Sequence, residues 1–337
     1  MDRTSRVYFS DHLYTICLMV SAPAPWQLTL ARIEGALPFI SAELAECLAL
    51  ASLRRLWRVQ VRDYPFDNLG IEHNPGLEAS ELVRTWYSEE RRQFLSWISR
   101  RGHPTLAHAA KLVMDAKCHS EGFSEAYLPA DRALERLDAL LPTRDPMGTL
   151  LEWLAELRTE EIDFLEGGSE TVQAGGIVIT RASPRGAAWA ASLSAAIRPH
   201  LFGLGSAPIV LAGTMPRRLF KEHREEPFPA ALRGALDGAS ASAAEDIERM
   251  RAGLDRGQGA LSHLKASSTA PQAWKILIGL GPLNRAELAR ALQVTKRTAS
   301  QAASALVMSK LVSLRQLDGA LRPQQNIINA RFDQPEA

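Results

Sequence analysis

The chain has 337 residues, a formal net charge of +1, 46% hydrophobic residues and 23% charged residues. This length accommodates two or three domains with a sizeable core, and the composition is ordinary for a soluble globular protein. A net charge near zero excludes a surface that is basic throughout, although it leaves room for a local basic surface. Alanine, leucine, arginine and glutamate dominate, which favours helices over sheets.

The three cysteines are Cys17, Cys47 and Cys118, and they are widely spaced. An odd number without a CxxC spacing argues against a disulfide framework and against a cysteine zinc site. The apolar run within residues 13–26 is only about eight residues long, which argues against a signal peptide. No run approaches the ~20 apolar residues of a membrane span. We therefore expect a cytoplasmic protein.

Apolar residues at helical spacing predict an N-terminal helical domain over residues 1–141. Ser41 is expected to cap the second helix of this domain. The stretch 64–76 is rich in Pro, Asn and Gly and is interpreted as a loop. The tryptophans Trp57, Trp86, Trp97 and Trp153, together with Leu82 and Phe94, fall on apolar helix faces and are interpreted as core. The expected helices cover residues 27–37, 42–63, 77–102, 104–120 and 130–141.

A linker at 142–148 precedes a predicted central helical domain, residues 149–267. Residues 175–182 form the one β-like run that we identify there, while 208–213 fits either a second strand or a buried helical turn. The small residues of 184–205 predict close packing against a neighbour. The expected helices cover residues 149–168, ended by two glycines, and 228–267, as one long helix or a broken pair.

Residues 270–330 have the order of a winged helix-turn-helix: three short helices and then a β-hairpin. Asn284, with Glu287 three residues later, predicts the start of the second helix, and Thr295 predicts the start of the third. Asp318-Gly319 is typical of a type I′ hairpin turn. The inner face of helix 295–309 is expected to consist of Ala299, Ala302, Ala303, Leu306 and Val307.

In such a module the second helix braces the third, whose N-terminal side chains enter a DNA major groove. Arg and Lys can donate to guanine and Gln can pair with adenine, while wing arginines contact phosphates or the minor groove. The candidate DNA-binding residues are Thr295, Lys296, Arg297, Thr298, Gln301 and Ser304 on the third helix, and Arg315 and Arg322 on the wing.

The charge distribution supports this interpretation. Residues 271–325 contain eight basic and two acidic residues, a net charge of +6, so the rest of the chain sums to −5. The positive field is thus concentrated on the segment that would enter the groove.

The pattern "LARALQVTKRTASQAASALVMSKLV" (288–312) resembles the C-terminal winged helix of Fic/Doc-family proteins, with Ser309-Lys310 where that family usually has a glycine. The likeness extends over 228–316 and implies a Fic-like core in the central domain. The catalytic motif HPFxxGNGR is absent, however. Its nearest counterpart, "RPHLFGLGSAP" (198–208), lacks the His-Pro-Phe order, the Asn and the second Arg. A Fic-like core would therefore be degenerate and inactive.

Two N-terminal stretches, "LASLRRLWRVQVRDYPFD" (50–67) and "ELVRTWYSEERR" (81–92), are similar to a plasmid-borne rhizobial family of helix-turn-helix proteins of uncharacterised function. This resemblance covers about a third of the chain. It implies a DNA-binding protein encoded on a bacterial plasmid.

Other clusters are interpreted as structural. His103, His108 and His119 lack the i, i+4 spacing of a helical metal pair. The carboxylates within 152–166 are more typical of a solvated helix face. We expect no catalytic residue, no cofactor and no metal.

The sequence therefore predicts a mainly α, non-enzymatic protein that binds double-stranded DNA as a homodimer, as a transcriptional or plasmid-maintenance regulator. The alternative is a non-catalytic scaffold, or a degenerate Fic-like protein, whose winged helix mediates protein–protein contacts. A small-molecule or protein effector of unknown identity fits either case.

Overall fold

The computed structural model describes residues 24–62, 89–113, 127–160, 169–174, 177–182, 188–204, 209–215, 219, 227–315 and 319–324. Within this part, the chain is mainly helical, as the composition predicted. None of the helices in these ranges has the length and apolar character to cross a membrane. The predictions on Leu82, Trp86, His119, Cys17, Cys118, the loop 64–76 and the glycines after the helix at 149 fall outside the described residues.

Helices α2 and α3 begin within two residues of the predicted starts, α5 ends within one residue of its predicted end, and α6 begins at the predicted residue; the predicted start of helix 77–102 and end of helix 104–120 lie outside the described residues. Ser41 caps α3, because its hydroxyl accepts a hydrogen bond from the backbone N–H of Leu44 at 3.2 Å. Phe94 and Trp97 of α5 are fully buried, as expected. The elements are α2 (Pro25–Ala36), the 3₁₀ turn η1 (Leu37–Phe39), α3 (Ala42–Arg62), α5 (Glu89–Arg101) and α6 (Pro104–Val113).

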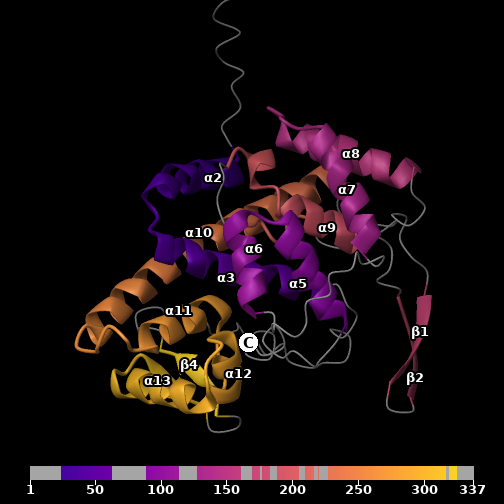
Figure 1. Cartoon of the computed structure of the whole chain (residues 1–337). Helices are drawn as coiled ribbons and strands as arrows, with labels where there is room; N and C mark the ends of the chain where they lie inside the picture. The colour runs from indigo at the N-terminus through magenta and orange to yellow at the C-terminus, as the bar shows by residue number, and fades with distance from the viewer. Residues whose placement is uncertain are drawn as a thin grey trace, which may run out of the picture.

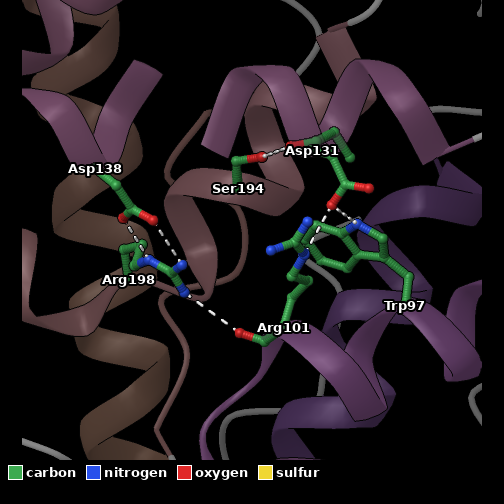
Figure 2. Close-up of polar contacts among 7 residues, drawn as sticks. Trp97, Arg101, Asp131, Asp138, Ser194 and Arg198 are labelled. Carbon is green, nitrogen blue, oxygen red and sulfur yellow. Dashed lines mark hydrogen bonds and ion pairs between the residues drawn. The ribbon is translucent and has the colours of Figure 1, made fainter. Parts of the chain in front are cut away.

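In the middle of the chain, small residues allow close helix packing. The hydroxyl of Ser194 on α9 donates to the backbone oxygen of Ala130 on α7 at 3.0 Å (Figure 2). Helix α8 begins three residues before the predicted start at 149, so 146–148 belong to it. The elements are α7 (Leu128–Ala139), α8 (Pro146–Glu160), α9 (Ala188–Ala196) and the 3₁₀ turn η6 (Pro199–Phe202).

A polar network joins α5 to α7 and to Arg198, the residue directly before η6 (Figure 2). The buried Asp131 carboxylate accepts from the Trp97 indole N–H at 3.0 Å and from Arg101 Nε at 2.9 Å. Arg198 forms two hydrogen bonds with Asp138, at 2.7 and 2.9 Å, and a third with the backbone oxygen of Arg101 at 3.3 Å. Because every bond of this network crosses between elements, it fixes their relative positions.

Residues 169–182 form an antiparallel hairpin of β1 (Ser169–Ala174) and β2 (Ile177–Ala182). In Figure 1 the hairpin stands apart from the helices. The sequence predicted only the second strand, so β1 corrects that interpretation. The prediction of a second strand or a buried helical turn at 208–213 was wrong in both forms. The described residues, 209–213, form neither a strand nor a helix, although Ile209, Val210 and Leu211 are buried.

Helix α10 (Phe228–Leu261) is continuous, so the alternative of a broken pair is wrong. It crosses behind much of the molecule in Figure 1. Asp246, a buried carboxylate on α10, pairs with Arg55 of α3 and with Arg249 of α10 itself. Further along, α10 packs against the C-terminal helices.

The C-terminal elements follow the predicted order of three helices and two strands. Strands β3 and β4 pair antiparallel, and Leu321 also forms a bridge to Leu283, since its N–H donates to the Leu283 oxygen at 2.8 Å. The elements are α11 (Ala270–Leu280), α12 (Arg285–Ala291), α13 (Lys296–Met308), β3 (Val312–Leu314) and β4 (Leu321–Pro323).

One buried apolar cluster includes residues from all three predicted domains. Helix α11 lies directly on α3: a Cβ at Gly279 would be 2.7 Å from the Cβ of Leu50 and 3.2 Å from the oxygen of Cys47. Lys275 of α11 pairs with Glu46 of α3 at 3.1 Å. The C-terminal helices are therefore packed onto the rest of the protein and are not a tethered, separate unit.

Candidate nucleic-acid interface

Helix α12 is positioned by a capping box at its first residues. The Asn284 side chain accepts from the backbone N–H groups of Ala286 and Glu287, both at 3.0 Å. In return, the Glu287 carboxylate accepts from the Asn284 N–H at 2.9 Å. This reciprocal arrangement satisfies donors that a helix start otherwise leaves unpaired. It confirms the predicted start of the second helix.

The turn between α12 and α13 is tight. Gln293 has a positive φ of 55°, in the left-handed region that reverses the chain direction. Thr295 then caps α13, because its hydroxyl accepts from the Thr298 N–H at 3.2 Å, and the two hydroxyls lie 2.9 Å apart. The cap is as predicted. However, Thr295 and Thr298 already use their hydroxyls within the helix, so their first role is to hold its start.

The two faces of α13 are sharply different. Its buried residues are Ala299, Ala302, Ala303 and Leu306, as predicted, whereas Val307 is only half-buried. Small alanines let the helix lie close to its neighbours. Helical geometry of about 100° per residue puts a second set of residues on the opposite side. The members of this set, all exposed, are Arg297, Gln301, Ser304 and Met308.

We call Arg297, Gln301, Ser304 and Met308 the outer line of α13. It contains three of the predicted DNA-binding residues. Lys296 is also exposed but lies to the side of the line, and Thr298 is half-buried. The structure thus separates the six predicted helix residues into three that share one outward line and three near the helix start.

The hairpin presents its two arginines differently. Arg322 is exposed and pairs in register with exposed Ser313. Arg315 is half-buried and already interacts within the protein. The register also corrects the predicted turn: Arg315 lies opposite Ala320, and its N–H donates to the Ala320 oxygen at 2.8 Å. Four residues therefore separate the paired positions, whereas a type I′ turn has two.

The positive charge is smaller than the sequence count suggests. Lys275 pairs with Glu46 and faces α3, so it does not contribute to the outer surface. Six other basic side chains form no ion pair within the described part of the chain. These are Arg285, Arg290, Lys296, Arg297, Lys310 and Arg322.

Sequence reasoning missed two exposed apolar residues near this surface. Met308 ends the outer line and is 78% exposed, while Leu314 of β3 is 45% exposed. The helical spacing from Arg297 through Ser304 to Met308 was a signal available in the sequence. No comparable signal marked Leu314. A strand of three residues is too short for the alternation of apolar and polar residues to show which side chains point outward.

The other clusters considered from the sequence do not form a site in the described residues. No group of His, Cys, Asp and Glu there has the geometry to hold a metal ion. Burial lowers the pKa of His103, and burial together with Arg198 lowers the pKa of His200, against an opposing effect of Asp138. His200 lies in η6, within the stretch compared with the Fic motif, and Gly203 follows with a φ of 76°.

No protein-family model matches the chain, and no curated protein does. The resemblances to Fic/Doc proteins and to a rhizobial helix-turn-helix family therefore stay hypotheses.

Proposed function

We propose that the chain is a sequence-specific DNA-binding protein in which residues 270–324 fold as a winged helix-turn-helix and α13 enters the major groove. The order of α11, α12, α13, β3 and β4 supports this assignment. So does the bridge between Leu283 and Leu321, because it places the segment between α11 and α12 beside the hairpin. In this architecture the second helix supports the third at the groove.

The single observation that carries the proposal is the outer line of α13. Arg297, Gln301 and Ser304 are exposed and project from the face opposite the buried alanines. A guanidinium can donate two hydrogen bonds to guanine, and a Gln amide can pair with adenine. The six unpaired basic residues supply the attraction to phosphate that brings such a helix to DNA.

We further propose a homodimer acting in the cytoplasm as a transcriptional or plasmid-maintenance regulator. A single α13 reads only a few base pairs, and two-fold symmetry doubles the readout. The helices of 1–141 and 149–267 would then supply the dimer contacts. Since α11 packs rigidly on α3, their arrangement would set the spacing of the two half-sites.

The test begins with selection of bound duplexes from a random library by the full chain at ~50 mM salt, where electrostatic contacts are strong. Fluorescence anisotropy then measures the selected duplex against Arg297→Ala and Gln301→Ala. We expect each substitution to weaken binding about tenfold or more, in line with 1–3 kcal/mol per base contact. Arg251→Ala, an exposed position on α10, is the matched control. Absence of any duplex binding at this salt concentration contradicts the proposal.

A second candidate function has one specific observation in its favour. Met308 and Leu314 are exposed and apolar, which suits a protein partner better than a phosphate backbone. The chain would then be a scaffold, or a degenerate Fic-like protein, whose C-terminal module binds protein. Self-association that is lost in Met308→Glu, together with no duplex binding, would favour this second function.

A further inference from the structure

A surface hollow of about 430 Å³ lies where three separate segments meet. Helix α2 forms one wall, the connection from α7 to α8 forms the second, and η6 with Gly203 forms the third. The volume is within the usual range for sites that hold small molecules. It is distinct from the C-terminal helices and plays no part in the proposed DNA contact.

The floor of the hollow is apolar. Trp26, Leu30, Leu201 and Phe202 line it, and each is at most 5% exposed. Two of these side chains are aromatic and come from different elements. Each of these side chains shows only a small part of its surface to the hollow, and an apolar, partly aromatic lining suits a ring better than a wholly polar ligand.

A cation stands at the rim. Arg144 is exposed and makes no hydrogen bond or ion pair with any residue in the described ranges. Its backbone is held on both sides: the Thr143 hydroxyl accepts from the Asp145 N–H at 3.0 Å, and the Asp145 carboxylate caps α8 by accepting from the Gly148 N–H at 3.0 Å. Glu34 of α2 also lines the hollow. The backbone that carries Arg144 is therefore held in place, and its exposed side chain lines the hollow together with the apolar residues and the carboxylate of Glu34.

We propose that this hollow binds a small aromatic carboxylate. The ring of the ligand covers Trp26 and Phe202, and its carboxylate accepts hydrogen bonds from Arg144. A planar guanidinium matches a carboxylate with two parallel bonds, which gives the site its preference for an acid.

The hollow is connected to the C-terminal helices through α10. The backbone N–H of Trp26 donates to the Asp237 carboxylate of α10 at 2.9 Å. About 24 and 30 Å along the same helix, at 1.5 Å per residue, Gly253 and Gly257 lie against Ile278 and Trp274 of α11. A ligand on Trp26 would thus contact a residue that is hydrogen-bonded to the helix that packs against the proposed DNA-binding module. This regulatory consequence rests on the proposed function, whereas the binding itself does not.

The binding test uses isothermal titration calorimetry on the full chain, with three probes: phenylacetate, phenethylamine and acetate. We expect phenylacetate to bind and the other two, which lack the acid or the ring, to give no heat at about 5 mM. Arg144→Gln should weaken phenylacetate binding at least tenfold, and Arg251→Gln on the exposed face of α10 should leave it unchanged. Binding of phenethylamine as tight as that of phenylacetate, no effect of Arg144→Gln, or no phenylacetate binding each overturns the proposal.

The calorimetric experiment contains no DNA, so its result tests ligand binding in the hollow independently of the proposed DNA-binding function. A separate arm measures affinity for the selected duplex with and without phenylacetate. We expect a change of at least about fivefold in the unmodified chain and none in Arg144→Gln, within the usual range of coupling between sites. An unchanged affinity in both overturns the coupling through α10.

Discussion

The indole N–H of Trp274 on α11 donates to the backbone oxygen of Gly253 on α10 at 2.8 Å. One turn further, the indole ring lies so close to Gly257 that a Cβ there would overlap its Cδ1 and Nε1 atoms. The guanidinium of Arg256 covers the ring at 5.9 Å from its centroid and donates to the Gln324 oxygen at 2.6 Å. The two glycines are thus contact surfaces, which explains why α10 tolerates them without a break.

Gly257→Ala tests this contact. The added methyl group overlaps the ring and forces α11 to move, so we expect the free energy of unfolding to fall by about 1–3 kcal/mol. Gly259→Ala is the matched control on the same helix, because nothing lies within 4 Å of its Cβ position. The control should raise the free energy of unfolding by about 0.5–1 kcal/mol through helix propensity. Urea unfolding measures both, and equal effects of the two substitutions would contradict the assigned contact.

Asp131→Ala removes the acceptor shared by Trp97 and Arg101. The Trp97 N–H is then buried without a partner, so we expect a loss of about 2–3 kcal/mol in the free energy of unfolding. Asp138→Ala removes the other carboxylate in Figure 2, whose side chain is 43% exposed. It should cost about 1 kcal/mol or less, as a partly exposed ion pair does. A larger loss for Asp138→Ala than for Asp131→Ala in the same urea experiment would reverse this ranking.

Two substitutions of Thr295 distinguish its role in helix capping from a role in DNA binding. Thr295→Ala should lower the free energy of unfolding by about 1 kcal/mol, because the Thr298 N–H loses its acceptor. Thr295→Asp keeps a good capping group and adds a negative charge at the proposed phosphate surface. It should leave thermal stability near that of the unmodified chain while duplex affinity falls. If Thr295→Asp binds the duplex as tightly as Thr295→Ala does, the start of α13 does not lie beside the phosphate backbone.

Local signals in the sequence predicted the helix starts well. The pairs Asn284–Glu287 and Thr295–Thr298 form their bonds within three residues, so no tertiary information is needed to infer them. The inner alanines of α13 follow from periodicity for the same reason. Strand β1 was missed because Ser-Glu-Thr-Val-Gln-Ala carries few apolar residues, and its pairing with β2 is what makes it a strand.

Features that depend on distant residues could not be inferred. Lys275 was counted in the basic surface because its partner, Glu46, lies 229 positions away. The glycines of α10 indicated a break because propensity alone counts against them, whereas Ile278 and Trp274 fill the space beside Gly253 and Gly257. The predicted two-residue turn did not match the observed pairing because Asp-Gly is compatible with more than one loop length.

Cys47 is expected to resist modification. Burial raises the pKa of its thiol to about 12, from an ordinary value of 9.0, and nearby Lys275 only partly opposes this. At pH 8 the thiolate, which is the reactive form, is thus about a thousandfold rarer than in an exposed cysteine. With Cys17 and Cys118 replaced by serine, labelling by a disulfide reagent should be slow in the folded chain and immediate in urea.

The burial of the Cys47 thiol also makes the free energy of unfolding depend on pH. The folded state holds the proton that the unfolded state releases above pH 9.0, so the contribution of Cys47 is complete below that pH and is lost as the pH rises toward 12. The free energy of unfolding of the single-cysteine chain should therefore fall more steeply above pH 9 than that of a Cys47→Ala chain. Parallel curves would contradict the assignment.

Arg322 and Gln301 are expected to contribute differently to duplex binding. Arg322 is an exposed hairpin cation, and a phosphate contact by it releases one counterion. Arg322→Ala should therefore weaken binding to all duplexes alike and lower the slope of log affinity against log salt concentration by about 1. Gln301 lies on the outer line of α13, so Gln301→Ala should leave the slope unchanged and relax the preference at one base pair of the selected sequence. Anisotropy titrations at several salt concentrations, against the selected duplex and single-base variants, separate the two effects. A base-specific loss from Arg322→Ala with an unchanged slope would place the hairpin in a groove and not on the phosphate backbone.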